Sequence, residues 1–392
     1  MLRRVVVLVM IISFSINAYS QVNYPSVEKG LSMSSQDKKV KMKLSFRSQN
    51  LASYQNNFDG SDEDMKAMVR RMRLKTNGYI FDPKFEYKLE LALSNRDQGN
   101  SRDAAQVSNG SKIVLDAVLK YHFGKKQQIW FGQTKLPGNR ERVVSSMALQ
   151  FVDRSNVNSK FNIDRDFGVQ YRYKLNAGEM PIMLAAAVTT GEGRNITANN
   201  PQAGLAYTGR LEFLPFGNFT KKGDYFSADL AREEGQKLSV GVTYSLNQNT
   251  NRSGGQLGNF ITMSDTNGTT NLFNDITTVF IDAVYKYNGF SFAGEYALKD
   301  LSDDISGFTS GSGYVGQVGY LFDNNYEISS RYTSVDLADG LGATKNTTEY
   351  TLGFSRYIVG HKLKVQSDVS YFVIEGASSD EYRFRLQVEF GI

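Results

Sequence analysis

The chain has 392 residues, with 45 Lys or Arg against 40 Asp or Glu, and its formal net charge is +5. This small excess does not indicate a nucleic-acid partner, and the absence of cysteine excludes a disulfide framework. The mean hydropathy is −0.38 and no stretch of eighteen or more apolar residues occurs, which excludes a membrane protein built of helices.

The first twenty residues predict a secretory signal peptide. Arg3 and Arg4 precede an apolar run of twelve residues, and Ala18 and Ser20 supply small side chains at the cleavage site. Twelve residues are too few for a spanning helix, so we expect cleavage after Ser20 rather than a membrane anchor. Without Arg3 and Arg4, 43 basic residues remain against 40 acidic ones, a net charge of +3. Residues 21–37 show no periodicity and predict a periplasmic lead-in.

From residue 38 onward, apolar and polar residues alternate, which predicts strands with one apolar face. In 38–49, for example, Leu44 and Phe46 alternate with Lys43 and Arg47. The 22 Tyr, 25 Phe and 35 Gly against 6 Pro also favour strands and turns. Sixteen strands are predicted: 38–49, 67–80, 84–94, 112–123, 128–135, 167–175, 180–190, 203–213, 236–247, 275–287, 289–299, 312–321, 325–335, 346–357, 361–374 and 381–392.

The connections between these strands alternate in length. Long ones fall at 50–66, 95–111 and 136–164, and short ones at 81–83, 124–127 and 176–179. Outer-membrane barrels have long loops outside and short turns in the periplasm. The connection 214–235 is an exception, since it is long but falls on the periplasmic side. A strand at Tyr225–Arg232 would make seventeen and place the termini on opposite sides, so we do not expect one.

A soluble barrel or propeller is the alternative all-β fold. Its strands would have one core face and one face in water, whereas here full charges repeat on the polar faces in strand after strand. Enclosing unpaired charges is costly unless the lumen is wide and filled with water. We therefore predict an all-β transmembrane antiparallel barrel over 38–392, with about sixteen strands around an aqueous channel. Its last strand, 381–392, carries the amphipathic pattern that barrel-assembly machinery recognises.

The long loop 136–164 is predicted to fold into the barrel and constrict the pore. Loops of this length inside a regular chain are usually functional or disordered. This one keeps Met147, Leu149, Phe151 and Phe161, which can pack against the wall. The loop and its flanks also carry the cations that we expect at the pore constriction: Lys135, Arg140, Arg142, Arg154, Lys160 and Arg165.

The first two strands carry a second basic cluster and no acidic residue over 38–49 and 66–75. Its inward members are expected to form a basic pore wall: Lys41, Lys43, Arg47, Arg71, Arg73 and Lys75. Arg70 has the lipid-facing parity and is expected near lipid phosphates at the outer rim. Rings of Arg and Lys select anions. The alternative is that these are ordinary soluble lumen positions of a general porin, because Glu86 and Asp116 also face inward.

The central stretch resembles a known family, the phosphate-selective porins O and P. The resemblance rests on FGQTKLP (131–137), on RDFGV (165–169), and on a run between them formed by Ser145, Ser146, Leu149, Phe151, Arg154 and Ser155. Asp153 departs from the pattern, because Glu is more frequent there. The motif match is limited to about 131–170, while the barrel pattern covers nearly the whole mature chain. The resemblance implies a sixteen-stranded, trimeric, anion-preferring porin.

Catalysis is not indicated. His122 and His361 lie far apart in the sequence, so a Ser–His hydrolase on the barrel is disfavoured, and we expect no catalytic residue, cofactor or metal. The sequence predicts a passive porin in the outer membrane of a Gram-negative bacterium. Small anions, phosphate-like ones among them, would be its solutes, and membrane lipids and lipopolysaccharide its surroundings, with no nucleic acid. The alternative function is a surface-binding or secretion-associated scaffold without an open pore.

Overall fold

The structure is a computed structural model of the chain, which describes residues 21–23, 31–58, 60, 63–98, 113–195, 204–265, 268–338 and 346–392. The predicted signal peptide and part of the lead-in lie outside the described residues.

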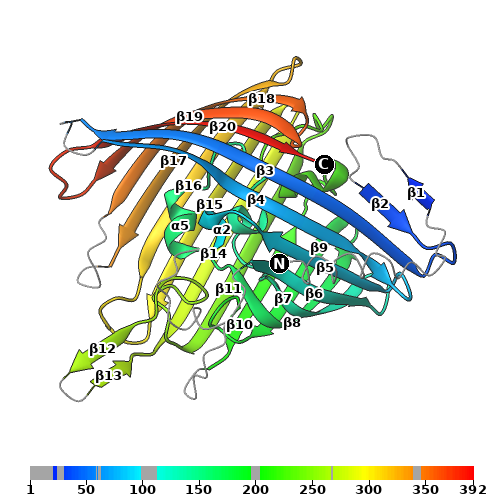
Figure 1. Cartoon of the computed structure of the whole chain (residues 1–392), viewed down its shortest axis with the longest axis horizontal. Coiled ribbons are helices and arrows are strands. Elements are labelled where there is room, and N and C mark those ends of the chain that lie inside the picture. Colours follow the sequence, from blue (N-terminus) through cyan, green and yellow to red (C-terminus); the bar gives the residue numbers. More distant parts are fainter. Residues whose placement is uncertain are drawn as a thin grey trace, which may run out of the picture.

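Within the described residues, sixteen antiparallel strands close into a barrel (Figure 1). Each strand pairs with its neighbours in the chain, and the last pairs with the first, so no barrel strand is left with an open edge. The strands are β3 (Val40–Asn57), β4 (Asp64–Ile80), β5 (Phe85–Ala92), β6 (Val114–His122), β7 (Gln127–Lys135), β8 (Arg165–Ala177), β9 (Met180–Thr189), β10 (Ala206–Phe213), β11 (Lys237–Thr250), β14 (Asn274–Tyr287), β15 (Phe290–Leu301), β16 (Gly311–Leu321), β17 (Tyr326–Leu337), β18 (Thr347–Val359), β19 (Leu363–Ile374) and β20 (Glu381–Gly391).

Two small strand pairs lie outside the barrel, at opposite ends in Figure 1. β2 (Leu31–Ser34) extends the sheet beside the start of β3, and β1 (Gln21–Asn23) pairs with β2. A hairpin of β12 (Thr262–Asp265) and β13 (Gly268–Asn271) projects from the long-loop end. No helix in the described part of the chain is long and apolar enough to cross a membrane.

The predicted sixteen-stranded barrel is confirmed, but its first hairpin differs from the expectation. β3 continues to Asn57 and β4 begins at Asp64, so the predicted long loop 50–66 is wrong. The strand continues with Asn50 and Ala52 on its outer face, which breaks the apolar alternation that the prediction relied on. The predicted absence of a strand at Tyr225–Arg232 is confirmed, because a short 3₁₀ helix, η1 (Thr220–Tyr225), occupies part of this segment.

Arg70 does not have the lipid-facing position expected from its parity. Gln49 pairs with Arg71 whereas Asn50 pairs with Val69, so a β-bulge inserts Arg70 into β4. A bulge reverses the parity of the residues beyond it. The guanidinium of Arg70 therefore points into the lumen.

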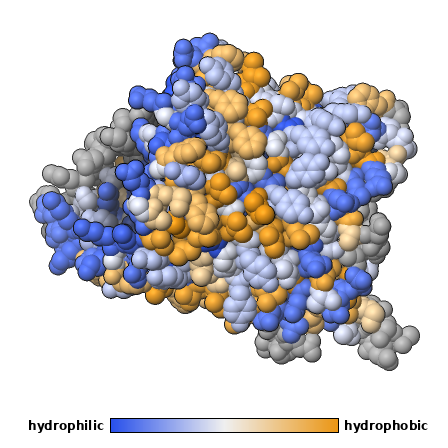
Figure 2. Space-filling model, turned by 180° about the vertical axis from the view of Figure 1, so that it is seen from behind, coloured by the Kyte–Doolittle hydropathy of each residue, from blue (hydrophilic) through white to orange (hydrophobic). Residues whose placement is uncertain are grey.

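The two faces of the wall have opposite chemistry. Outward side chains are apolar and exposed, and Figure 2 shows hydrophobic side chains gathered across the wall with hydrophilic ones at the rim. Inward side chains are polar and buried against the two segments that enter the barrel. Asp116, Thr243, Lys364 and Glu389 are 0% exposed. Lipid outside and a polar lumen inside account for this inverted arrangement.

Aromatic side chains form belts near both ends of the outer wall. On the long-loop side, Tyr314, Tyr332, Tyr350 and Tyr371 form a chain in which successive ring centroids are 5.8, 5.2 and 6.3 Å apart. On the short-turn side the contacting pairs include Phe46 with Phe390 and Tyr326 with Phe354. Aromatic girdles of this kind mark the two membrane–water interfaces.

Because closure leaves detergent no free edge from which to unzip the sheet, the folded barrel should survive SDS without heating. We expect purified protein to give a β-rich circular dichroism spectrum and to change its apparent mass on SDS gels when boiled. A helical spectrum, or the same mobility before and after boiling, would contradict this fold.

Candidate functional site

Loop 136–164 lies inside the barrel and has a hydrophobic core with the wall. It contains two short helices, α4 (Arg140–Val143) and α5 (Asn156–Phe161). Ser155 caps α5, because its Oγ accepts a hydrogen bond from the backbone N of Asn158 at 3.2 Å. The buried cluster joins Leu136, Val157, Phe161 and Ile163 to wall residues of β9 and β14–β17, namely Ala187, Phe280, Ala297, Val315, Val335 and Leu337.

Glycines on the inner wall allow the loop to approach closely. A Cβ at Gly313 of β16 would lie 2.9 Å from the ring of Phe161, and one at Gly353 of β18 would lie 2.9 Å from the ring of Phe151. Both distances are too short for an unstrained carbon–carbon contact, whose optimum is about 3.5–4.0 Å. A side chain at either glycine would therefore push the loop away from the wall.

Arg140 of α4 ties the loop to β10, to β14 and to segment 214–236. Its guanidinium lies within 3.2 Å of Glu212 and 3.1 Å of Asp282, and 3.5 Å from Asp224. It also donates to Ser239 Oγ at 2.9 Å. Burial alone would lower the pKa of Arg140, but the surrounding carboxylates, Glu212 foremost, raise it above its usual value. Arg140 is thus a permanently charged anchor rather than a free cation.

A second anchor joins the loop to β3 and β4. Asp153 accepts hydrogen bonds from Arg70 at 2.7 Å and from Arg71 at 2.8 Å, so the bulge described above places two guanidinium groups on one carboxylate. Burial would raise the pKa of Asp153, but Arg71 and Arg70 hold it well below its usual range. Nearby, Arg47 donates to Ser146 Oγ at 2.7 Å and lies 3.5 Å from Glu389.

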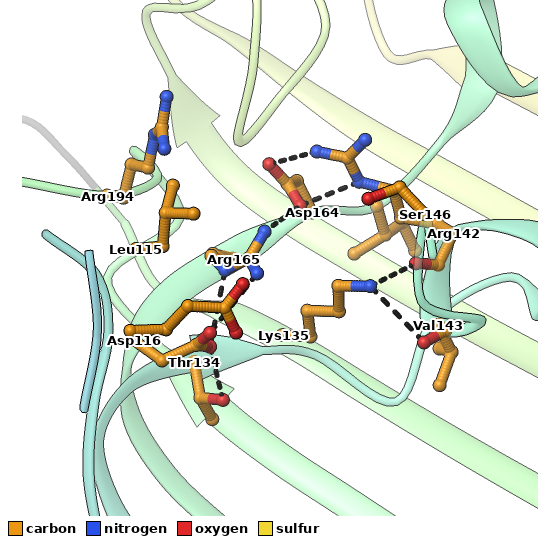
Figure 3. A network of polar contacts seen from close by, with 12 residues as sticks. Leu115, Asp116, Thr134, Lys135, Arg142, Val143, Ser146, Asp164, Arg165 and Arg194 are labelled. Carbon is orange, nitrogen blue, oxygen red and sulfur yellow. Dashed lines mark hydrogen bonds and ion pairs between the residues drawn. The ribbon is translucent and has the colours of Figure 1, made fainter. Parts of the chain in front are cut away.

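The base of the loop is held by a third polar network, drawn in Figure 3. Arg142 is ion-paired with Asp164, and Arg165 bonds Asp116 at 3.1 and 3.2 Å. Lys135 donates through its Nζ to backbone carbonyls of the loop, the shortest at 2.6 Å to the carbonyl of Arg142. Burial would raise the pKa of Asp164, but Arg142 and Arg165 hold it below its usual value.

The remaining predicted constriction residues play different parts. Arg154 donates to the backbone carbonyls of Glu141 at 2.8 Å and Val144 at 2.7 Å, and burial lowers its pKa, with Arg142 adding to the effect. The half-buried Lys160 makes no ion pair with a described carboxylate. The structure therefore places five of the six predicted cations, all but Lys160, in contacts that hold the loop.

The six residues of the predicted pore wall also fall into two groups, those held in polar contacts and those without an ion pair. Arg47 and Arg71 contact the loop, while Arg73 bonds Asp97 at 2.7 Å and Glu90 at 3.1 Å. The other three members, Lys41, Lys43 and Lys75, make no ion pair with any carboxylate that the structure describes. These three lysines are the members of the predicted pore wall that remain free of ion pairs with described carboxylates.

A second segment, 214–236, also enters the barrel, from the short-turn side. Lys286 of β14 is 1% exposed, and its Nζ donates to the carbonyls of Gly223, Phe226 and Ala228 at 2.9, 2.8 and 2.6 Å. The two inward segments meet, since the backbone N of Ser227 donates to the carbonyl of Ala148 at 2.9 Å. Phe226 packs there against Val144, Ala148 and Leu149 of the loop.

A cavity of about 640 Å³ remains between these segments and the β5–β10 side of the wall. Its lining is strongly basic and includes Lys88, Lys120, Lys126, Arg172, Lys174, Lys221 and Lys222. Trp130 also lines it, with Lys120 Nζ 4.0 Å and Arg172 Cζ 4.1 Å from its ring. Such contacts stabilise cations without neutralising them.

Our sequence analysis overlooked most of this cavity. The alternation gives Lys88, Arg172 and Lys174 inward parity, but these residues belong to neither the predicted constriction nor the predicted pore wall. Trp130 and Phe131 are both large aromatic residues of opposite parity in segment 128–135, so the alternation does not show which of them faces inward. The structure turns Trp130 inward, while Phe131 is outward and 55% exposed. Among the described residues, no group of three or more His, Asp or Glu could hold a metal ion.

A closed sixteen-stranded barrel with an apolar outside, aromatic belts and a charged lumen defines the class of outer-membrane porins. The family model described as "Phosphate-selective porin O and P" matches residues 41–381. The chain therefore belongs to this family, as the resemblance implied, and resides in the outer membrane of a Gram-negative bacterium.

Other comparisons agree with this class. A protein of Aquifex aeolicus (strain VF5), described as uncharacterized, is 26% identical over 337 residues, which cover 80% of this chain and 76% of that protein. The anion-selective porin from Comamonas acidovorans has a TM-score of 0.56 and 12% identity, over 90% of this chain and 99% of that one. The trimer form of OmpT from Vibrio cholerae has a TM-score of 0.53 and 12% identity, with the same coverage. At such identities the two structures support the fold alone.

The role of Arg140 as an anchor can be tested by Arg140→Gln. This change leaves the carboxylates of Asp224, Glu212 and Asp282 with one fewer cation, and removing one partner of a buried ion pair costs about 3–5 kcal/mol. We expect the folded band on SDS gels to be lost at a clearly lower temperature. Lys160→Gln is the matched control, since it removes the same charge from the same loop without breaking an ion pair. Equal stability of the two variants would contradict the anchoring role.

Proposed function

We propose that the protein is a passive porin for small anions, phosphate-like ones among them, and that loop 136–164 narrows its passage. The proposal rests on one observation: many inward carboxylates are neutralised by ion pairs, whereas many inward cations are not. Inward carboxylates such as Asp116, Asp282 and Glu349 are fully buried and ion-paired. Glu86 is more open, with a side chain 46% exposed; His122 lies 3.4 Å away, and Lys120 is its cross-strand neighbour without a direct ion pair.

Cations are left over on the same surfaces. Those that make neither an ion pair with a described carboxylate nor one of the loop-holding contacts above include Lys41, Lys43, Lys75, Lys120, Lys126, Arg172, Lys174, Lys221 and Lys222. A passage lined by one sign of charge concentrates counter-ions and raises their rate of entry. Basic rings select anions on this principle. A net charge near zero for the whole chain is compatible with such a field, because most acids in the lumen are already neutralised by partners.

In this proposal the predicted constriction residues hold the loop in position instead of selecting the solute. Arg140, Arg142 and Arg165 position the loop, and the anchored loop confines solutes to the side of the lumen where the free lysines lie. A constriction strengthens each contact, because a charge pair at 4 Å is worth about 1 kcal/mol in water and several times more at an effective dielectric near 20. We infer that selectivity comes from the free lysines and narrowing from the loop.

An enzymatic role has less support. His361 is buried between Phe226 and Tyr357, with ring centroids 5.3 and 5.4 Å away, and burial keeps its pKa well below the usual value. A neutral imidazole enclosed by rings is placed for packing rather than for activating a nucleophile. His122 lies beside Glu86 near the end of β6. We therefore infer a channel.

Selectivity is tested by replacing Lys43, Lys75 and Lys120 with Gln. We expect the ratio of anion to cation permeability, measured from reversal potentials in KCl gradients, to fall at about 0.1 M salt. The difference should fade toward 1 M, because the Debye length shrinks from about 10 Å to about 3 Å. The control replaces the exposed lysines 39, 84 and 125. An unchanged ratio at low salt would contradict the proposal, and a lack of conductance would favour the scaffold alternative.

We also propose that the protein is a homotrimer, and that the outer face of β3 lies in the subunit interface. Asn50 faces outward between Val388 of β20 and Val69 of β4, which are 39% and 44% exposed. It lies midway between Phe46 and Tyr54, which belong to the two aromatic belts. An amide at this depth in lipid has no water to bond, so a partner subunit would satisfy it. The exposed Ala52 beside it allows close approach.

The interface is tested by Asn50→Trp, which should dissociate the trimer because the ring fills the space that a second subunit needs. The control is Val318→Trp, at an outward position of β16 that is 40% exposed and that we assign to lipid. Light scattering in detergent gives the mass of each. A trimeric Asn50→Trp variant, or equal dissociation of the control, would contradict this interface.

A further inference from the structure

Arg356 of β18 is the one cation that faces outward among the barrel strands that the structure describes. It pairs across the sheet with Tyr326 of β17 and Val365 of β19. The adjacent outward residues of β18, Phe354 and Ile358, are 48% and 52% exposed. A charge on the lipid face of a barrel is costly at the midplane of the bilayer and much less costly near its surface. The depth of Arg356 and its partners therefore decide what this charge does.

Arg356 lies at the depth of the membrane–water interface on the short-turn side. Tyr326, which is directly opposite, is the first residue of β17 after the turn. Its ring is stacked on that of Phe354, with the centroids 5.5 Å apart, in the aromatic belt on this side of the barrel. Such belts lie at the level of the lipid headgroups. The guanidinium of Arg356 is thus at the level of the phosphates of the periplasmic leaflet.

The described part of the chain gives this guanidinium no acidic partner. Arg356 makes no ion pair with a described carboxylate, and its Nη1 donates no hydrogen bond to a described acceptor. The acid next to Tyr326, Glu327, faces the lumen, where Gln150 and Tyr357 donate to it at 2.6 Å each. An unpaired cation on an apolar surface is unfavourable. We therefore expect an anion from outside the chain to pair with it.

An aromatic ring holds the guanidinium in position. The Cζ of Arg356 lies 4.3 Å from the centroid of the Tyr326 ring, and a cation–π contact of this kind leaves the charge intact. The turn before this ring is fixed from the periplasmic side, because Arg232 donates to the carbonyl of Phe322 at 2.6 Å and to Asn325 Oδ1 at 3.2 Å. A donor group that is already held in place loses less freedom when it binds a ligand.

We propose that Arg356 and Tyr326 form a binding site on the outer wall for the headgroup phosphate of an anionic phospholipid in the periplasmic leaflet. The planar fork of a guanidinium matches two oxygens of a phosphate group. The acyl chains would run toward the middle of the membrane along Phe354 and Leu352, the latter 67% exposed. The site lies outside the passage, so the proposal does not depend on which solute the porin conducts.

A lipid fits this position better than a partner subunit does. β18 is separated by β19 and β20 from β3, the strand that we assign to the subunit interface. The large exposed side chains around Arg356 are suited to acyl chains, whereas the polar Asn50 and small Ala52 of β3 are suited to close contact between subunits. A carboxylate of a partner subunit is the alternative occupant, and the assembly mass distinguishes it.

The test uses the whole porin in detergent micelles, with phosphatidylglycerol as the probe and native mass spectrometry to measure its affinity. In Arg356→Gln this affinity should fall about fivefold, the effect of losing one charge contact at the membrane surface. The loss in Arg356→Lys should be smaller, because the charge remains. The affinity for phosphatidylcholine should change little, since its choline group offsets the charge of its phosphate.

The matched control is Arg172→Gln. Arg172 also lies over an aromatic ring, 4.1 Å from Trp130, and also makes no ion pair with a described carboxylate, but it faces the lumen. Its removal should leave the affinity for phosphatidylglycerol at the wild-type value. An unchanged affinity in Arg356→Gln, or an equal loss in Arg172→Gln, would overturn the lipid site. A smaller assembly mass of Arg356→Gln in light scattering would also overturn it and would assign Arg356 to the subunit contact.

Discussion

The arrangement of the lumen depends on one buried ion-pair cluster around Arg140. This guanidinium comes from loop 136–164, Asp224 comes from the segment 214–236, and Glu212 and Asp282 come from β10 and β14. Three parts of the chain that are distant in sequence are thus joined through one planar cation. Arg suits this role because its charge is permanent and its five donors are fixed in a fork. The geometry of the two inward segments follows from where this cluster lies.

The same cluster explains how charge is distributed in the passage. Holding loops inside a barrel requires polar partners on the wall, because a buried donor or acceptor without a partner costs about 1–3 kcal/mol. The carboxylates of β14–β20 meet that need: Glu327 accepts from Gln150 of the loop at 2.6 Å, and Asp368 accepts from the backbone N of Val152 at 3.0 Å. Many inward acids are thus used to hold the two inward segments and the wall together, whereas cations of β3–β9 such as Lys43, Lys75 and Lys174 make no ion pair with a described carboxylate. An anion-selective field therefore arises from an almost neutral chain.

The barrel itself was largely predictable from the sequence, because period-two alternation and loop lengths are local signals. Strand number, the polarity of the lumen and the absence of a seventeenth strand followed from them. The predictions were wrong where the chain breaks the two-residue alternation. The outward Asn50 hid the second half of β3, and the bulge at Arg70 reversed a facing that parity had assigned to lipid. Neither could be recognised without the partner strand, since a bulge is a property of the pairing.

The roles of individual cations were harder to predict, for a physical reason. Sequence shows that Arg140, Arg142 and Arg154 are basic, but whether a cation is free depends on which carboxylate or carbonyl lies opposite it across the lumen. Asp282, the partner of Arg140, is 142 residues away along the chain. The free cations turned out to be ones such as Lys75 and Lys222, which make no ion pair with a described carboxylate. The sequence shows that these residues are positively charged, but it does not show that they lack an ion-pair partner.

The free cations of the N-terminal strands come to lie on one side of the lumen once the barrel closes. The apolar cluster of loop 136–164 packs mainly on β14–β17, and segment 214–236 is tied to Lys286 of β14 and to the turn before β15 through Asp229. Both segments therefore fill the side of the lumen formed by the C-terminal strands. The space that stays open lies against β5–β10, where the lining is basic. The position of the passage and its sign of charge thus have one common cause, which is the side of the barrel to which the inward segments are anchored.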